Sequence, residues 1–69
     1  MTQCEMIMQH LEQYGSITAA EAMNEYGIAR LASRISDLKR DGVCIKRRMV
    51  TAKNRFGDSV SFAEYSLEE

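Results

Sequence analysis

Proline and tryptophan are absent from this 69-residue chain, histidine occurs once and cysteine twice. Cys4 and Cys44 lie far apart and form no CxxC pair, so the usual spacing of a zinc site is missing. His10 has no second histidine with which to share a metal ion. We expect both cysteines to be small buried thiols in a reducing cytoplasm; a disulfide or an intermolecular bridge is the alternative.

Long apolar runs are missing as well. None approaches the ~18 residues of a membrane helix, and the first ten residues lack the Lys or Arg of a signal peptide. The chain has no nucleophile elbow, phosphate-binding loop or recognisable carboxylate pair, and its length leaves little room for a catalytic pocket. We therefore expect one cytoplasmic domain over residues 1–69, which is not an enzyme and uses no cofactor, metal, membrane or small-molecule substrate.

Basic residues are absent from both ends of the chain. Residues 1–29 and residues 56–69 each contain four acids and no Lys or Arg. All nine basic residues fall within residues 30–55, against two acids, which gives this segment a charge of +7 although the whole chain carries −1. A polyanion responds to such a local field rather than to the net charge. The charge pattern therefore favours a nucleic-acid partner.

Thr2 and Glu5 have the spacing of a capping box, in which two side chains satisfy free backbone N–H groups at a helix start. A helix is predicted over residues 2–14, and Gly15 is a natural end because glycine tolerates a positive φ. His10 lies on the flank of its apolar stripe and is expected to be solvated or at the core edge. The stripe consists of Cys4, Ile7, Met8, Leu11 and Tyr14.

Thr18 and Glu21 repeat the capping-box spacing and predict a second helix over residues 19–25. The connector before it, residues 16–17, can form a short strand because Ile17 is β-branched.

A turn over residues 26–28 separates this helix from a third, which is predicted over residues 29–40 and stops at Gly42. An apolar stripe backed by a charged face is ordinary for a surface helix. Its place after a short turn and before basic strands favours a binding role. The expected core side carries Ile28, Leu31, Ala32, Ile35 and Leu38, and the outer side carries Arg30, Ser33, Arg34, Asp37, Arg40 and Asp41.

After Gly42 the sequence takes on the character of a β-hairpin. Residues 43–51 are rich in β-branched side chains, and residues 53–58 contain the Asn, Gly and Asp of a hairpin loop. Residues 59–67 form the predicted return strand.

Within the return strand, Ala63, Tyr65 and Leu67 alternate and are expected to face the helices. Val60 and Phe62 have the opposite parity. Either the outer hairpin has a small apolar face of its own, or a bulge changes the register.

This order of elements resembles the small winged helix-turn-helix proteins of phages and prophages in Gram-positive bacteria. The resemblance rests on Gly15-Ser16-Ile17-Thr18, on the run RLASRISDLK over residues 30–39, on Gly42 and on the terminal Tyr65-Ser66-Leu67. It covers roughly residues 4–67. It implies an α+β, mainly helical fold, with three helices followed by a β-hairpin wing, and binding to double-stranded DNA.

In such a domain the third helix enters the major groove, where base edges present distinct patterns of donors and acceptors. The resemblance implies base contacts by Arg30, Ser33, Arg34 and Asp37. Asp37 could accept from a cytosine amino group, orient Arg34 or Arg40, or repel a phosphate. The resemblance also implies contacts to the DNA backbone by Thr18, Arg40, Lys46, Arg47, Arg48, Lys53 and Arg55. Of these residues, Arg55 is the best candidate to enter the minor groove. An alternative for the Lys46–Arg48 run is an edge strand that its charge protects against aggregation.

Two classes of function follow. The first is a DNA-binding transcriptional regulator of a phage or prophage, or an excisionase-like architectural factor. The second is a protein-binding inhibitor of host machinery on the same scaffold, for example an anti-CRISPR protein, which the acidic first helix and tail would suit. A homodimer on a two-fold DNA site is also expected, with Met6, Phe56 and Phe62 as candidate contacts.

Overall fold

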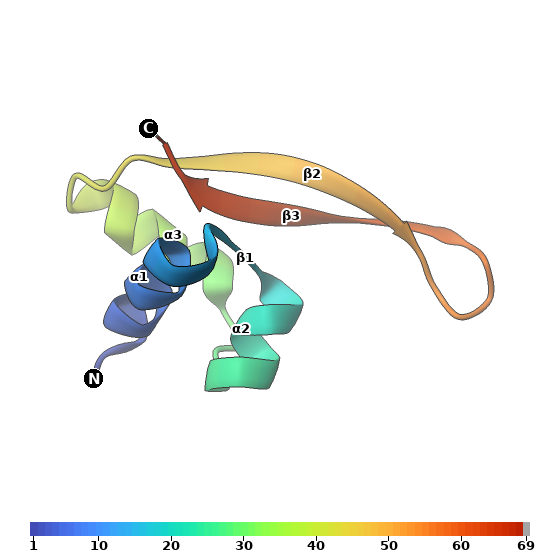
Figure 1. The fold of residues 1–69 in the computed structure, drawn as a ribbon, viewed down its shortest axis with the longest axis horizontal. Coiled ribbons are helices and arrows are strands. Elements are labelled where there is room, and N and C mark those ends of the chain that lie inside the picture. Colours follow the sequence, from blue (N-terminus) through green and yellow to red (C-terminus); the bar gives the residue numbers. More distant parts are fainter. Residues whose placement is uncertain (69) are drawn as a thin grey trace.

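The computed structural model describes residues 1–68, which fold into three helices and one three-stranded antiparallel sheet (Figure 1). The sheet has the order β1-β3-β2. The α+β class is confirmed, but two strands of nine residues each give the sheet a larger share than a mainly helical chain would have. The elements are α1 (Gln3–Tyr14), β1 (Ser16–Thr18), α2 (Ala19–Tyr26), α3 (Leu31–Arg40), β2 (Ile45–Lys53) and β3 (Ser59–Leu67).

Both predicted capping boxes are present. The Glu5 amide donates to Thr2 Oγ1 at 3.1 Å, and the Thr2 amide donates to Glu5 Oε1 at 3.0 Å. Thr18 and Glu21 repeat this exchange at the start of α2. Gly15 ends α1 with φ at +89°, a left-handed conformation that glycine adopts without steric cost. These local signals fix where α1 and α2 begin and where α1 ends.

The short connector forms β1, which pairs with β3 and places Ile17 opposite Tyr65. On its other edge β3 pairs with β2 over nine consecutive positions, from Ile45 opposite Leu67 to Lys53 opposite Ser59. This ladder is unbroken and contains no bulge. The hairpin extends well past β1 and the helices, as Figure 1 shows.

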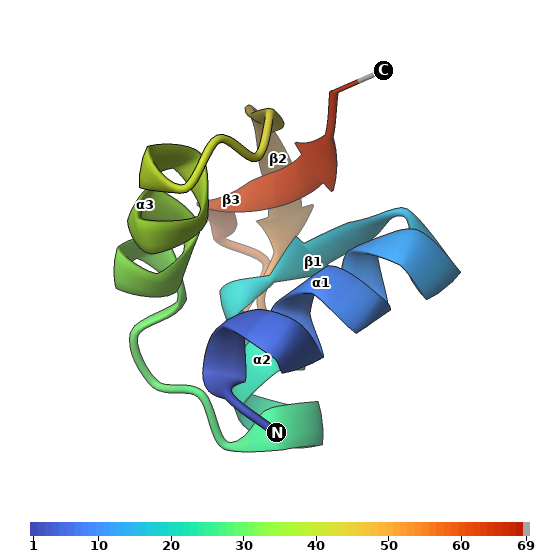
Figure 2. The ribbon, with the colours of Figure 1, turned by 90° about the vertical axis from the view of Figure 1, so that its left-hand side faces the viewer.

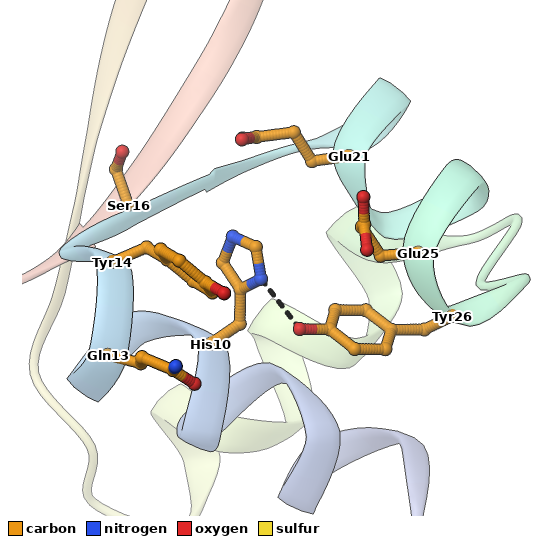
Figure 3. A pocket seen from close by; sticks show the side chains of 7 residues that line it. All are labelled: His10, Gln13, Tyr14, Ser16, Glu21, Glu25 and Tyr26. Carbon is orange, nitrogen blue, oxygen red and sulfur yellow. Dashed lines mark hydrogen bonds between the residues drawn. The ribbon is translucent and has the colours of Figure 1, made fainter.

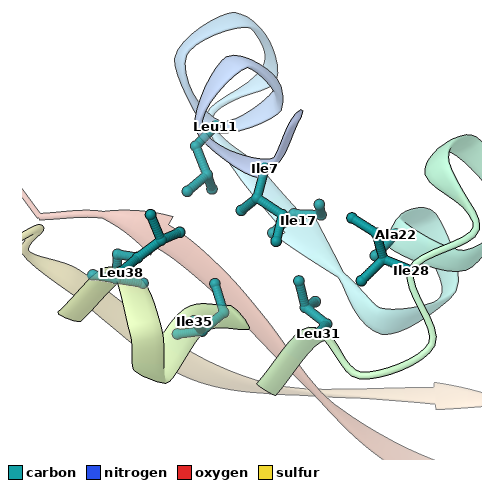
Figure 4. Close-up of a cluster of buried hydrophobic side chains, with 9 residues drawn as sticks. Ile7, Leu11, Ile17, Ala22, Ile28, Leu31, Ile35 and Leu38 are labelled. Atoms are coloured by element: carbon teal, nitrogen blue, oxygen red, sulfur yellow. The ribbon is translucent and has the colours of Figure 1, made fainter. Parts of the chain in front are cut away.

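The core lies between the helices and the near end of the sheet. Ile17 of β1 has no exposed surface and sits at its centre, between α1 and the buried stripe of α3 (Figure 4). Figure 2 shows α1 running beside β1, with α3 to their left. The buried hydrophobic residues are Ile7, Leu11, Ile17, Ala22, Ile28, Leu31, Ile35, Leu38 and Ile45.

Three expectations about burial are wrong. Tyr14 is 66% exposed because it is the last residue of α1, where the helix has run past the core. Ala32 is exposed because the buried stripe of α3 runs through Leu31 and Ile35. Cys44 is exposed in the loop before β2, whereas Cys4 is half-buried, and both thiols are free.

Over residues 1–68 no helix is long and apolar enough to cross a membrane.

Candidate nucleic-acid interface

The buried stripe of α3 determines which side of this helix faces outward. Leu31, Ile35 and Leu38 are buried at successive turns, and Ile28 is buried just before the helix begins. At 100° per residue, the direction opposite this stripe passes close to Ser33, Asp37 and Arg40. The expectation of an apolar inner side and a polar outer side is therefore confirmed for this helix, with Ala32 as the exception.

The helix begins later than predicted, at Leu31 rather than Ala29. Arg30 occupies the N-cap position with φ −122° and ψ 61°, and no side chain of residues 1–68 caps the helix there. Its side chain is exposed at the helix start. Arg30 is thus next to the N-terminal end of α3 rather than on the helix itself.

Asp37 organises the outer face of α3. Its carboxylate oxygens lie 3.3 Å from the guanidinium of Arg34 and 3.5 Å from that of Arg40, each three residues away along the helix. The Arg34 side chain is 38% exposed, and within residues 1–68 its buried Nε has no hydrogen-bond partner. It lies in a shallow hollow shared with Gln3 and Ala29. Three of the predicted groups therefore form one cluster in which Asp37 orients two cations.

Ser36 is an exposed residue of α3 that was not among the predicted contacts. Its side chain is exposed on the second turn of α3, whereas Ser33 is half-buried. The helical period could have predicted this exposure. Ser36 lies about 100° around the helix from the buried Ile35, and it lies one turn beyond Ser33. Lys39 is likewise exposed beside Arg40 and was left out of the predicted contact set.

The Lys46–Arg48 run divides between the two faces of the hairpin. Arg47 shares the helix-side face with its partner Tyr65, which packs against the core. Lys46 and Arg48 point to the opposite face. There the Arg48 guanidinium donates to Glu64 Oε1 at 2.8 Å. This ion pair is on an exposed surface and leaves most of the Arg48 side chain accessible.

The wing tip is a tightly ordered loop. Asn54 Oδ1 accepts hydrogen bonds from the amides of Phe56 and Asp58, at 2.9 and 3.1 Å. Backbone bonds from Asn54 to Asp58 and from Gly57 to Asn54 close the loop, with Gly57 at φ +82°. Arg55 is therefore held at the far end of the hairpin, next to a Phe56 side chain that is 83% exposed.

Thr18 has a different environment from the other predicted backbone contacts. Its hydroxyl accepts from the Glu21 amide at 3.2 Å, and its own amide donates to the Glu21 carboxylate at 2.9 Å. The carboxylate of Glu21 therefore lies at the start of α2, next to the Thr18 hydroxyl that is predicted to contact a phosphate.

Three helices, the third carrying an outward polar face, followed by a two-stranded wing define the winged helix-turn-helix class. The chain belongs to this family: the family model described as a winged helix-turn-helix domain matches residues 2–69. Such domains are typically DNA-binding modules without enzymatic activity, so membership indicates DNA binding. None of the curated proteins compared with the chain matches it.

Proposed function

We propose that this protein is a regulator that binds double-stranded DNA, with α3 in the major groove and the β2–β3 wing along the backbone. The observation that carries this proposal is the placement of charge on the family's scaffold. All nine basic residues lie from Arg30 onward, through α3 to the wing tip, whereas residues 1–29, which form α1 and α2, contain none. Placing α3 and the wing on the DNA brings these cations to the phosphates, which attract them.

Base contacts are assigned to Arg30, Ser33, Arg34 and Asp37, with Ser36 as an addition that its exposure supports. Arg34 and Arg40 are held by Asp37, and an arginine so oriented can donate to both acceptors of a guanine. Backbone contacts are assigned to Arg40 and to the cations of the hairpin, which are Lys46, Arg47, Arg48, Lys53 and Arg55. Arg55 at the ordered tip is the group proposed to enter the minor groove.

The first experiment is fluorescence anisotropy with a labelled random-sequence duplex, from low to physiological salt. If about four cations neutralise phosphates, the logarithm of the binding constant falls with the logarithm of salt concentration with a slope of about −3.6. No binding at low salt would overturn the proposal. Sedimentation of the complex on the specific site, once it is selected, tests the expected two-fold dimer.

The biological setting that we propose is a phage or prophage of a Gram-positive bacterium. There the protein would act as a transcriptional regulator or an excisionase-like architectural factor in the host cytoplasm. This setting rests on the run RLASRISDLK, which spans Arg30 and most of α3.

A second candidate is a protein-binding inhibitor on the same scaffold. One feature favours it: Val50 pairs with Phe62 and Ala52 pairs with Val60 on the face of the outer hairpin that carries Lys46 and Arg48. Phe62 and Val60 are 37% and 40% exposed, and exposed apolar side chains gathered in this way are typical of protein contacts. A variant that loses DNA affinity yet keeps its biological effect would decide for this function.

A further inference from the structure

A hollow of about 350 Å³ lies between α1, β1 and α2, away from the cations of α3 and the wing (Figure 3). Aromatic side chains of α1 and α2 line it together with two carboxylates of α2. The side chains that matter here are His10, Tyr14, Glu21, Glu25 and Tyr26. A pocket is not expected in so short a chain, and none of the proposed DNA contacts lines this one.

His10 is the buried polar group of this hollow. It is only 5% exposed, and its Nδ1 lies 2.7 Å from Tyr26 Oη. Its other ring nitrogen, Nε2, is buried and has no hydrogen-bond partner among residues 1–68. Figure 3 shows this nitrogen directed away from Tyr26, toward the space between Ser16 and Glu21. A buried nitrogen without a partner costs free energy, which a bound ligand can recover.

The charges around the hollow determine which ligand suits it. Nε2 donates or accepts according to the tautomer of the ring. Glu21 and Glu25 both border the hollow, and residues 1–29 contain no Lys or Arg to balance them. Burial raises the pKa of Tyr26, and the negative charge of Glu25 raises it further. An anion would be repelled here, whereas a cationic N–H donor would be attracted.

The rings supply a second attraction. His10 and Tyr14 have ring centroids 4.7 Å apart at an angle of 47°, and Tyr26 meets His10 edge-on at 5.5 Å. Tyrosine faces attract ammonium and guanidinium groups through the ring quadrupole. A metal ion is a poorer fit, because the described residues contain no group of three His, Cys, Asp or Glu placed to hold one.

We propose that this hollow binds a ligand through an ammonium or guanidinium group. The ligand N–H donates to His10 Nε2, and the His10 Nδ1–H donates to Tyr26 Oη. Glu21 and Glu25 neutralise the charge of the ligand. A free small amine and an arginine side chain of a protein share this chemistry. The site shares no residue with the proposed DNA contacts, so the two proposals are tested independently.

The test is NMR of the ¹⁵N-labelled full chain, with the His10 ring nitrogens as reporters. Agmatine represents a free small amine, and acetyl-Gly-Arg-Gly-amide represents an arginine side chain of a protein. The same peptide with citrulline in place of arginine is the uncharged control. We expect the two cationic probes to shift the Nε2 resonance and the citrulline peptide to leave it unchanged. The tighter of the two cationic probes identifies the source of the ligand.

Charge variants complete the test. Glu25→Gln is expected to weaken binding about threefold, and Glu21→Gln/Glu25→Gln about tenfold, on the scale of exposed ion pairs. Glutamine at position 21 preserves the capping box. Glu12→Gln is the matched control because Glu12 is an exposed acid of α1 outside the hollow. If neither cationic probe shifts Nε2, if citrulline binds equally well, or if Glu12→Gln has the same effect as Glu25→Gln, the proposal is wrong.

Discussion

Asp37 gives the outer face of α3 its geometry. It lies one turn from both Arg34 and Arg40 and forms an ion pair with each. Exposed pairs of this kind contribute little to stability, about 0–1 kcal/mol each. Their effect is to restrict where two long side chains point, and this restriction reduces the entropy lost when those side chains contact DNA.

Arg34 is therefore the first residue to test. Arg34→Glu places two like charges one turn apart on the proposed DNA face, and we expect at least about a tenfold loss of affinity by anisotropy at low salt. Arg34→Gln, which removes the charge without reversing it, should fall between this variant and the wild type.

The matched control is Gln9→Glu/Asn24→Glu, which changes the net charge equally at exposed positions of α1 and α2. It should bind nearly as well as the wild type. If Arg34→Glu binds DNA like the wild type, the assignment of α3 as the recognition helix is wrong.

Glu5 predicts a pH dependence of stability. The backbone hydrogen bond from Thr2, and then the Thr2 side chain, hold the pKa of Glu5 below its usual 4.5. A carboxyl with a lowered folded-state pKa stabilises the fold above its unfolded-state pKa, and this contribution is lost as pH falls through the folded-state pKa. Urea unfolding from pH 6 downward should therefore show a steeper loss for the wild type than for Glu5→Gln. If the unfolding free energies of the two proteins fall in parallel as pH is lowered, Glu5 does not contribute this pH dependence.

At the scale of elements, α3 depends on a narrow stripe of buried side chains. Ile35 is 3% exposed at the centre of that stripe. Ile35→Ala should lower the free energy of unfolding by about 2–5 kcal/mol, because it removes buried methyl groups and leaves a cavity. Urea or thermal unfolding followed by circular dichroism measures this loss.

Ala32→Ser, three residues earlier on the exposed side of the same helix, is the control and should change stability by about 0.5 kcal/mol or less. Equal losses of unfolding free energy in the two variants would mean that α3 is rotated about its axis relative to the orientation described here. The assignment of its outer face would then be wrong.

The wing combines two functions in one hairpin. Its near end, around Ile45, Tyr65 and Leu67, packs against the core. Its far end extends past the helices of the described chain and is held by the nine-pair ladder and by the Asn54 loop. The near end therefore anchors the wing, while the far end presents Lys53 and Arg55 at a distance from the helices.

At the scale of the whole molecule, the cations are concentrated in α3, β2 and the loops beside them, whereas α1 and α2 carry only acids. Such a molecule is oriented by the field of a polyanion before any specific contact forms. The separation also explains why a chain with a net charge of −1 remains a candidate for DNA binding.

This charge distribution predicts that variants of the basic wing and of the acidic helices differ in their salt slope. The salt slope is the change in the logarithm of the DNA-binding constant with the logarithm of salt concentration. Lys53→Gln/Arg55→Gln should reduce the salt slope by nearly 2, since each lost phosphate contact removes about 0.9. Glu12→Gln/Glu25→Gln should leave the slope unchanged, because both acids lie on the helices away from the wing. Anisotropy titrations of the two variants against one duplex measure both slopes. Equal slopes for the wing variant and the wild type would show that the wing tip does not contact phosphates.

Much of this fold was predictable from local sequence. The capping boxes at Thr2 and Thr18, the stop at Gly15 and the switch from helical to strand period after Gly42 all appear in the structure. They depend on hydrogen bonds and side-chain spacings within a few residues, which a sequence displays directly. The concentration of cations in α3 and the wing was visible for the same reason. The sequence by itself thus determined the elements and their charges.

Only the tertiary structure decided which distant groups meet. His10 meets Tyr26 across sixteen residues, and Arg48 meets Glu64 across another sixteen. The exposure of Ala32 and the unbroken register that leaves Phe62 on an open face were also settled by packing. Burial and pairing depend on how separate elements approach one another, and no window of neighbouring residues contains that information. The proposed DNA face follows from the arrangement of the elements, whereas the hollow around His10 exists only because α1, β1 and α2 come together.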